Sequence, residues 1–292
     1  MAQNPNINKV EFGNDVLMDI TDTTAEPEDV AEGKVFYRKS GARAIGTLVT
    51  GRRTRRDITN DMANLSTAIA EQNLAKYGYA IGDYFVGPTN VGTSASPLYM
   101  VYTLADMDTY YGGYTSYAVV NTHHIAIVVD TKLTSAWLGS GSLTGYKAST
   151  LHTFLTGSSV LAKIKQDLAA LTGDAWSAHM IAHDKLYSTY ANSAFSWAWS
   201  STDTHTEYIS ALTEMDIYGA PVWSGNPYQQ GEAIKQLEVF RKFRFNEIFG
   251  NSWKWLRSMY SASGACYANY GGNARYYSIS SAGGVVGLIL YK

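Results

Sequence analysis

The sequence predicts an α+β fold in which strands open and close one large domain. Strand-like runs occur near both ends of that domain, as in "YMVYTLADM" and "VVGLILYK". Between them, "SVLAKIKQDLAALTG" has an apolar helical face, a cap at Ser159 and Gly173 just past its end. Mixed elements in this order are typical of the α+β class. We expect three parts: a small β-rich module at 1–55, a helical neck or linker at 56–77 and a ligand-binding domain at 78–292.

The first 55 residues are expected to form a small β unit. "DVLMDIT" and "KVFYRKSGARAIGTLV" are strand-like, and "KSGAR" is the turn between two short arms. A module of this size cannot bury a sizeable core alone, so self-association or docking to a partner is implied.

Residues 56–76 are expected to form a helix. Ile58, Met62, Leu65 and Ile69 are spaced four, three and four apart, as in an a/d seam two heptads long. Two interpretations stay open: an amphipathic helix packed on its own domain, or a short oligomeric neck that joins two modules.

Other elements follow from local patterns in the large domain. "HHIAIVVDT" is a continuous apolar run, which favours a central strand. Residues 174–190 are predicted to be a second helical stretch, and "AFSWAWSS" alternates like a strand. Thr213 and Asp216 have the spacing of a capping box, and Gly219 ends the short helix that it would start.

Composition excludes several function classes. Of the 292 residues, 16 % are charged, against about 25 % in typical proteins, and the formal net charge is −2. This balance favours neither nucleic acid nor an anionic membrane as a partner. The single cysteine excludes an intrachain disulfide. We find neither a membrane span nor a signal-peptide core, so we expect synthesis in a cytoplasm without export by the usual route.

No catalytic constellation stands out, so we expect a protein that is not an enzyme and has no cofactor. His179 and His183 would share a helical face, but "MIA" between them lacks the glutamate of a metalloprotease. Cys266 has no histidine near it in the C-terminal third and is expected to be a small buried residue. The tail has no clustered carboxylates for calcium, so we expect no metal.

The C-terminal tract 258–284 has a distinctive composition. It contains five tyrosines and many Ser, Gly, Ala and Asn residues, but no Asp, Glu or Lys. Antibody loops use the same vocabulary, with tyrosine for contact area and small polar residues for adaptable hydrogen bonds. The tract is either such a contact surface or a small-residue loop region with core alanines.

The tail "WLRSMYSASGACYANYGGNARYYSISSAGGVVGLILY" resembles the variable region of proteins that diversity-generating retroelements diversify. These proteins end in a C-type lectin-like fold, which formylglycine-generating enzymes share. "ISALTEMDIYG" is similar to the helix start of that fold, and "AIGDYFVG" resembles its opening strand in phages of Gram-positive hosts. "EPEDVAEGKVFYRKSGARAIGTL" resembles a short module of phage tail proteins. The closing "GVVGLILY" departs from the "GVRP" that many relatives carry. The matching framework is Trp255-Leu256-Arg257, Ser261-Ala262, Ala265-Cys266, Gly272-Asn273-Ala274 and Val285 to Tyr291.

The resemblance implies a variable region at about 255–287. In the family, copying that misreads adenines changes Asn-type codons to Tyr, Ser, Asn, Gly, Asp, Ile, Arg and others, but not to Trp, Lys, Glu, Gln or Met. Met259 is therefore counted as framework, and Tyr260 and Tyr276 are ambiguous. The implied ligand-binding residues are Tyr260, Gly264, Tyr267, Asn269, Tyr270, Gly271, Arg275, Tyr276, Tyr277, Ile279 and Ser281. The implied scaffold of the site is Trp253, Trp255, Arg257, Cys266 and Asn273.

The function that the resemblance implies is a phage tail receptor-binding protein, located in the virion and active as a homotrimer. Its partners would be a host cell-surface receptor, either protein or glycan, and other tail proteins. Two alternatives stay open. One is an enzyme on the same fold, similar to the formylglycine-generating oxidases, with a metal or cofactor near Cys266 or His179 and His183. The other is a purely structural virion protein.

Overall fold

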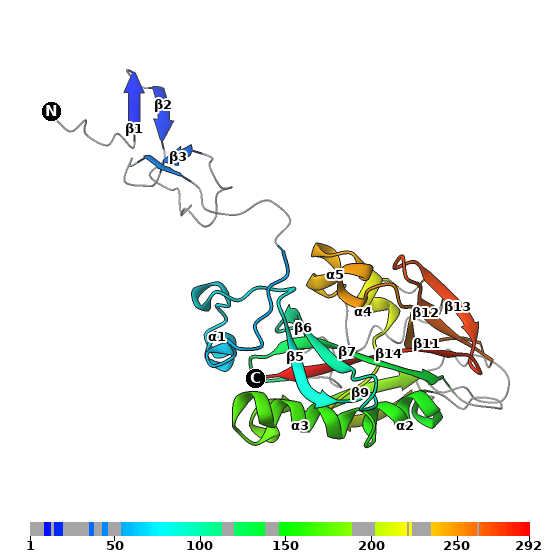
Figure 1. Cartoon of the computed structure of the whole chain (residues 1–292). Helices are drawn as coiled ribbons and strands as arrows, with labels where there is room; N and C mark the ends of the chain where they lie inside the picture. Colours follow the sequence, from blue (N-terminus) through cyan, green and yellow to red (C-terminus); the bar gives the residue numbers. More distant parts are fainter. Residues whose placement is uncertain are drawn as a thin grey trace. The chain divides into compact units, whose positions relative to one another are not determined.

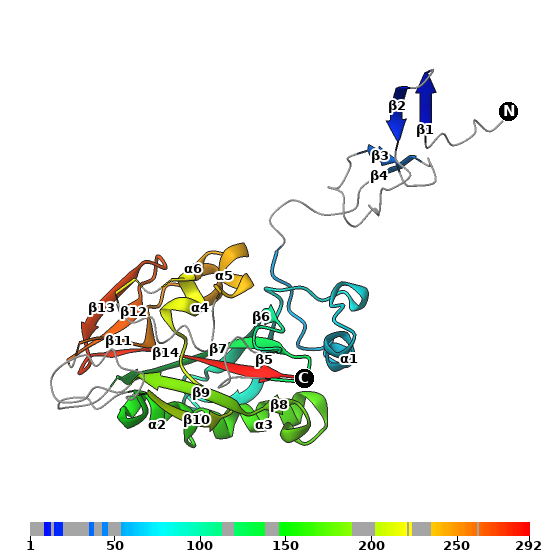
Figure 2. The same cartoon turned by 180° about the vertical axis from the view of Figure 1, so that it is seen from behind.

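The chain divides into two compact units, Met1–Thr54 and Arg55–Lys292. The computed structural model describes residues 54–112, 120–137, 146–188, 202–220, 222–223, 235–261 and 263–292, and the backbone of four strands in the first unit (Figures 1 and 2). In that unit β1 (Lys9–Phe12) pairs antiparallel with β2 (Asp15–Asp19). β3 (Val35–Tyr37) pairs antiparallel with β4 (Arg43–Ile45). The strands that flank "KSGAR" therefore pair as the sequence predicts.

One mixed sheet organises the second unit. Its strands among the described residues are β5 (Tyr84–Asn90), β6 (Tyr99–Met107), β7 (Ile125–Ala136), β8 (Met180–Ile181), β11 (Lys254–Ser261), β12 (Gly264–Ala268), β13 (Ala274–Ser278) and β14 (Ala282–Tyr291). The order is β13-β12-β11-β14-β7-β6-β5, and β8 pairs with β14. Neighbouring strands run antiparallel except β11 and β14, which are parallel. β9 (His183–Ser188) and β10 (Thr202–Glu207) form a separate antiparallel pair.

The centre of the sheet is the apolar strand that the sequence predicts. β7 lies between β14 and β6, and its residues from Ile125 to Thr131 are all buried. A strand covered on both faces needs such a continuous apolar run. The prediction for "HHIAIVVDT" is confirmed.

Short helices lie on both sides of this sheet. They are α1 (Leu65–Ala70), α2 (Thr150–Thr156), α3 (Leu161–Thr172), α4 (Glu214–Tyr218), α5 (Glu238–Lys242) and α6 (Phe245–Phe249), with 3₁₀ turns η2 (Ala75–Tyr77), η3 (Tyr146–Ala148) and η4 (Trp176–Ala178). α2 and α3 run along one side, and α4, α5 and α6 lie on the other side beside β11, β12 and β13 (Figures 1 and 2). The second unit is mixed, with more β-sheet than helix, and is compatible with the α+β class.

Helix termini agree with the sequence signals in part. Thr213 and Asp216 form the predicted capping box, and Gly219 ends α4 in the left-handed region at φ 72°. Gly173 ends α3 in the same way at φ 76°. The residue at the start of α3 is Val160, so the predicted cap at Ser159 is wrong. "AFSWAWSS" lies outside the described residues.

The expected neck is part of the domain core. Within the stretch 56–76 the α-helix spans only Leu65–Ala70, and Ile58, Met62, Leu65 and Ile69 are all buried in the second unit. Ile58 donates its backbone N–H to the Tyr84 carbonyl at 2.8 Å, which places it beside β5 instead of in a helix. The seam is therefore buried against its own domain, and the compact unit begins at Arg55. In the described part of the chain, no helix is long and apolar enough to cross a bilayer.

Candidate functional site

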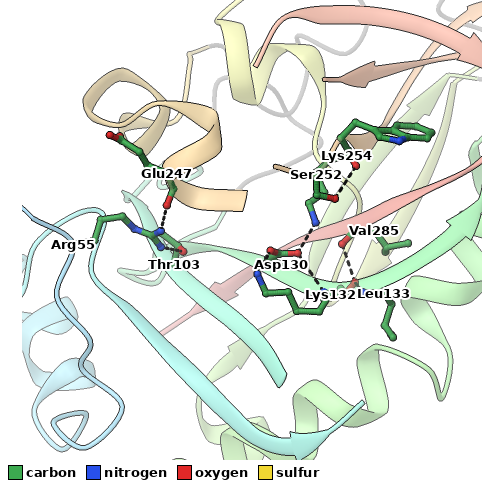
Figure 3. Close-up of polar contacts among 11 residues, drawn as sticks. Arg55, Thr103, Asp130, Lys132, Leu133, Glu247, Ser252, Lys254 and Val285 are labelled. Carbon is green, nitrogen blue, oxygen red and sulfur yellow. Dashed lines mark hydrogen bonds and ion pairs between the residues drawn. The ribbon is translucent and has the colours of Figure 1, made fainter. Parts of the chain in front are cut away.

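The C-terminal tract is built on a strand that is fixed to the centre of the sheet. Lys254 begins β11 and is buried, with Nζ 2.6 Å from Oδ1 of Asp130 on β7 (Figure 3). Lys132 lies 2.5 Å from the other carboxylate oxygen of Asp130. Burial lowers the pKa of Lys254, and the charge of Asp130 opposes that shift. The tract is thus anchored by a charge pair that is almost fully buried.

Apolar packing and hydrogen bonds to backbone groups hold the residues of β11 that follow Lys254. Trp255 and Leu256 are fully buried. The indole N–H of Trp137 donates to the Leu256 carbonyl at 2.6 Å, and the Arg257 N–H donates to Leu212 at 2.9 Å. These contacts place the scaffold residues Trp255 and Arg257 in the core, together with Cys266.

The strands β12 and β13 form a hairpin at the edge of the sheet. The Asn269 side chain closes its turn, because Oδ1 accepts hydrogen bonds from the N–H groups of Gly271 and Asn273 at 3.0 and 2.9 Å. Gly272 adopts φ 80°, and a Cβ there would lie 2.6 Å from Cβ of Phe245. The turn therefore requires glycine at this position for both conformation and space. The Asn273 side chain is exposed, so Asn273 supports the turn through its backbone.

The expected binding residues differ widely in exposure. Two of them, Gly264 and Ile279, are buried and offer no side-chain surface to a ligand. The exposed members are Tyr260, Tyr270, Gly271, Arg275, Tyr276 and Tyr277. The partly exposed members are Tyr267, Asn269 and Ser281. Ile279 lies just past the end of β13, and its burial suits its apolar side chain.

Adjacent tyrosines of β13 point to opposite faces of the hairpin, as strand alternation requires. On one face the rings of Tyr276 and Tyr260 stack at 3.9 Å and 17°. Trp223 packs beside them, 5.0 Å from the Tyr276 ring, and its indole N–H donates to the Ala274 carbonyl at 3.1 Å. We call Trp223, Tyr260 and Tyr276 the stacked cluster.

A buried carboxylate positions Trp223. Glu214 is 1 % exposed, and its side chain accepts the N–H groups of Val222 and Trp223 at 2.9 and 3.0 Å. Charged acceptors form stronger hydrogen bonds than neutral ones. Sequence reasoning missed both Trp223 and Glu214, although an isolated tryptophan in the Gly- and Pro-containing run "GAPVWSGNP" is a signal for a contact residue.

The opposite face of the hairpin carries a pocket. Trp253, Tyr267, Asn269, Tyr270 and Tyr277 line a cavity of about 280 Å³. The Tyr267 ring lies 4.9 Å from that of Trp253 at 66° and 6.3 Å from that of Tyr277 at 80°. We call these five residues the tyrosine pocket. Four of its five members are residues that the sequence predicts for ligand binding, and the fifth is a predicted scaffold residue.

Cys266 lies in β12 of the hairpin and is fully buried. Burial raises the pKa of its thiol far above the ordinary range, and the neighbouring Glu214 raises it further. A thiol in this state is a poor nucleophile. We expect iodoacetamide at pH 8 to alkylate the native chain at least about 100-fold more slowly than the chain in guanidinium chloride. Equal rates in the two states, measured by mass spectrometry, would contradict the burial of this side chain.

The two histidines that the sequence places on one helical face do not share one. His179 follows η4, its Nδ1 lies 3.3 Å from the Ser66 hydroxyl, and its ring stacks on Tyr291 at 5.1 Å. His183 begins β9. The predicted helix over 174–190 is wrong because the chain enters β8, which pairs with β14. The chain between His179 and His183 therefore contains a strand, where residues four apart do not share a helical face.

No metal-binding group stands out among the described residues, where no three His, Cys, Asp or Glu side chains gather suitably. Comparisons of the chain with protein-family models, curated proteins and solved structures found no match.

Proposed function

We propose that this chain is a phage tail receptor-binding protein whose C-terminal hairpin binds a ligand on the host cell surface. The observation that supports it is the separation of two residue sets within one short tract. Framework positions such as Trp255 and Cys266 are fully buried, whereas Tyr270, Tyr276 and Tyr277 are exposed. Exposed tyrosines beside a rigid core are suited to binding, because they offer a large contact area at a low cost in conformational entropy.

The same separation would make sequence variation tolerable. Substitutions at exposed positions away from special backbone features usually change stability by within about 0.5 kcal/mol. The hairpin could therefore change its exposed residues while β11 and β14 keep it in place. We extend the proposal to diversification by a retroelement, a C-type lectin fold, a virion location and a homotrimer, for which the sequence resemblance is the support. Several copies on one particle would add avidity.

Flanking DNA tests the diversification step. We expect a near-copy of the DNA for residues 255–285 close to this gene, differing from it at template adenines, and a reverse transcriptase gene beside it. If the repeat is absent, diversification is lost, and adhesion then depends on the binding experiment alone.

Removing three hairpin tyrosines is expected to abolish adhesion. The combined variant Tyr267→Ala, Tyr270→Ala and Tyr277→Ala should bind host cells at least about 100-fold more weakly than the wild type, since aromatic residues dominate binding energy at interfaces. Fluorescently labelled full chain on cells of the host strain gives the measurement. The matched control is Tyr99→Ala, which removes an exposed tyrosine from β6 and should bind normally.

Two other outcomes would contradict adhesion. A wild-type chain that binds no host cells but assembles into tails would indicate a structural virion component. A preparation that carries a stoichiometric metal or cofactor and turns over a substrate would indicate an enzyme.

A further inference from the structure

We infer that the tyrosine pocket binds one uncharged pyranose residue of a host surface glycan. The inference rests on the proposed function and names the ligand class of the same hairpin. It depends on four properties of the pocket: the edge-to-face arrangement of its rings, its unused hydrogen-bonding groups, the lack of charge on its described lining residues, and its size.

The rings of the pocket are arranged to accept a further ring. Tyr267 meets Trp253 at 66° and Tyr277 at 80°, edge to face, so none of these three rings lies flat on another and each contact covers at most one ring face. In the stacked cluster, by contrast, Tyr260 and Tyr276 already lie face to face at 3.9 Å. An aromatic face carries negative charge density and attracts weakly positive hydrogens such as those on the C–H face of a sugar. The tyrosine pocket is therefore the better place for such a ligand.

The hydrogen-bonding groups of the pocket are unused within the described part of the chain. The hydroxyls of Tyr267, Tyr270 and Tyr277 make no hydrogen bond there, and neither does the Asn269 amide nitrogen. The Asn269 oxygen is occupied by the turn, which leaves its N–H₂ group as a donor. Three hydroxyls and one amide donor match the alternating donors and acceptors of a polyhydroxylated ring.

Charge and size narrow the ligand class. Among the described residues, the five that line the cavity include no carboxylate and no cation. Arg275 shares the strand face of Tyr277 but does not line the cavity. A volume of about 280 Å³ is at the lower limit of ligand pockets, which begin near 300 Å³. It suits one sugar ring at a time better than a folded protein epitope.

The walls of the pocket are held in place before any ligand arrives. A Cβ on Gly283 would lie 2.4 Å from the Trp253 ring, so the indole packs directly on the backbone of β14. Asn269 is fixed by its two turn hydrogen bonds. Because these side chains are ordered before binding, they lose less conformational entropy when a ligand binds. A single ring in a shallow site is still expected to bind with a dissociation constant of about 1 mM.

Saturation-transfer NMR on the full chain tests the inference with a panel of methyl glycosides of glucose, galactose, mannose, N-acetylglucosamine and N-acetylgalactosamine. We expect transfer to the ring C–H protons of at least one glycoside and its loss in both Tyr277→Ala and Tyr267→Ala. Tyr99→Ala is the matched control, because it removes an exposed tyrosine of β6 that lies outside the hairpin. Tyr99→Ala should keep the signal.

Absence of transfer from every glycoside would overturn the inference, and so would a signal that Tyr277→Ala leaves intact. Loss of the signal in Tyr99→Ala would overturn the assignment to this pocket. A cell-binding experiment distinguishes failure of this inference from failure of the proposed function. If adhesion depends on the three tyrosines and is lost after protease treatment of the cells but not after periodate treatment, the receptor is a protein. That result would support adhesion and refute the glycan.

Discussion

Replacing Trp255 with alanine is expected to lower the free energy of unfolding by about 3–5 kcal/mol. Trp255 is fully buried at the start of β11, 4.9 Å from the Trp253 ring and 6.0 Å from that of Tyr267. Removing the indole leaves a large cavity among residues that cannot close it, because Gly283 on the neighbouring strand has no side chain to fill the space. Chemical denaturation monitored by circular dichroism gives the measurement.

The matched control is Tyr270→Ala. Tyr270 is also an aromatic residue of the tract, but 60 % of it is exposed, so its loss is expected to change stability by within about 0.5 kcal/mol. A large loss of stability in Trp255→Ala and almost none in Tyr270→Ala would show that the buried positions hold the fold and the exposed positions do not. Similar losses of stability in the two variants would refute that division, whatever the ligand is.

A milder replacement separates packing from hydrogen bonding at the same site. The Trp255 indole N–H is buried and has no hydrogen-bond partner among the described residues. Trp255→Phe removes that unpaired group and keeps most of the ring. We expect Trp255→Phe to cost much less than the alanine variant, because the loss of an unsatisfied donor offsets part of the lost contact area.

Local signals in the sequence predicted much of the fold. The strand over "YMVYTLADM", the central strand β7 and the capping box of α4 each depend on residues close together in the chain, and the structure has all three. The helix expected over 174–190 failed because η4 leads into β8, whose partner β14 lies more than a hundred residues later. The helix expected over 56–76 forms only over Leu65–Ala70, and the apolar residues of the seam are buried in their own domain, as the first of its two interpretations has it.

The difference between local signals and long-range pairing also explains which parts of the candidate site the sequence could predict. Composition led to the hairpin tyrosines, because a tract without Asp, Glu or Lys can be recognised without any structure. Composition could not divide the tyrosines between two faces, since that depends on the pairing of β12 with β13. It also could not connect Glu214 with Trp223, whose hydrogen bond at 3.0 Å depends on how the chain folds back after α4.

Asp130→Ala is expected to destabilise the protein by about 3–5 kcal/mol, because it leaves the buried Lys254 without its counter-charge. Lys254 is only 2 % exposed and lies 2.6 Å from Asp130 (Figure 3). Lys132→Ala is the matched control: its side chain is 35 % exposed, so its loss should cost at most about 1 kcal/mol. The double variant Asp130→Leu with Lys254→Met removes both buried charges and should recover most of the stability.

The pH dependence of the Asp130→Ala variant provides an independent test. Without the carboxylate, burial and the charge of Lys132 both lower the pKa of Lys254 with nothing from Asp130 to oppose them, so its folded-state pKa lies further below the unfolded value of about 10.4. Between those two pKa values the unfolded chain binds a proton that the folded chain does not, so stability falls as pH falls through that window. The deficit of Asp130→Ala relative to the wild type should therefore shrink as the pH rises toward about 10.4. A deficit that is constant from pH 7 to that value would show that Asp130 acts through packing and not through the charge of Lys254.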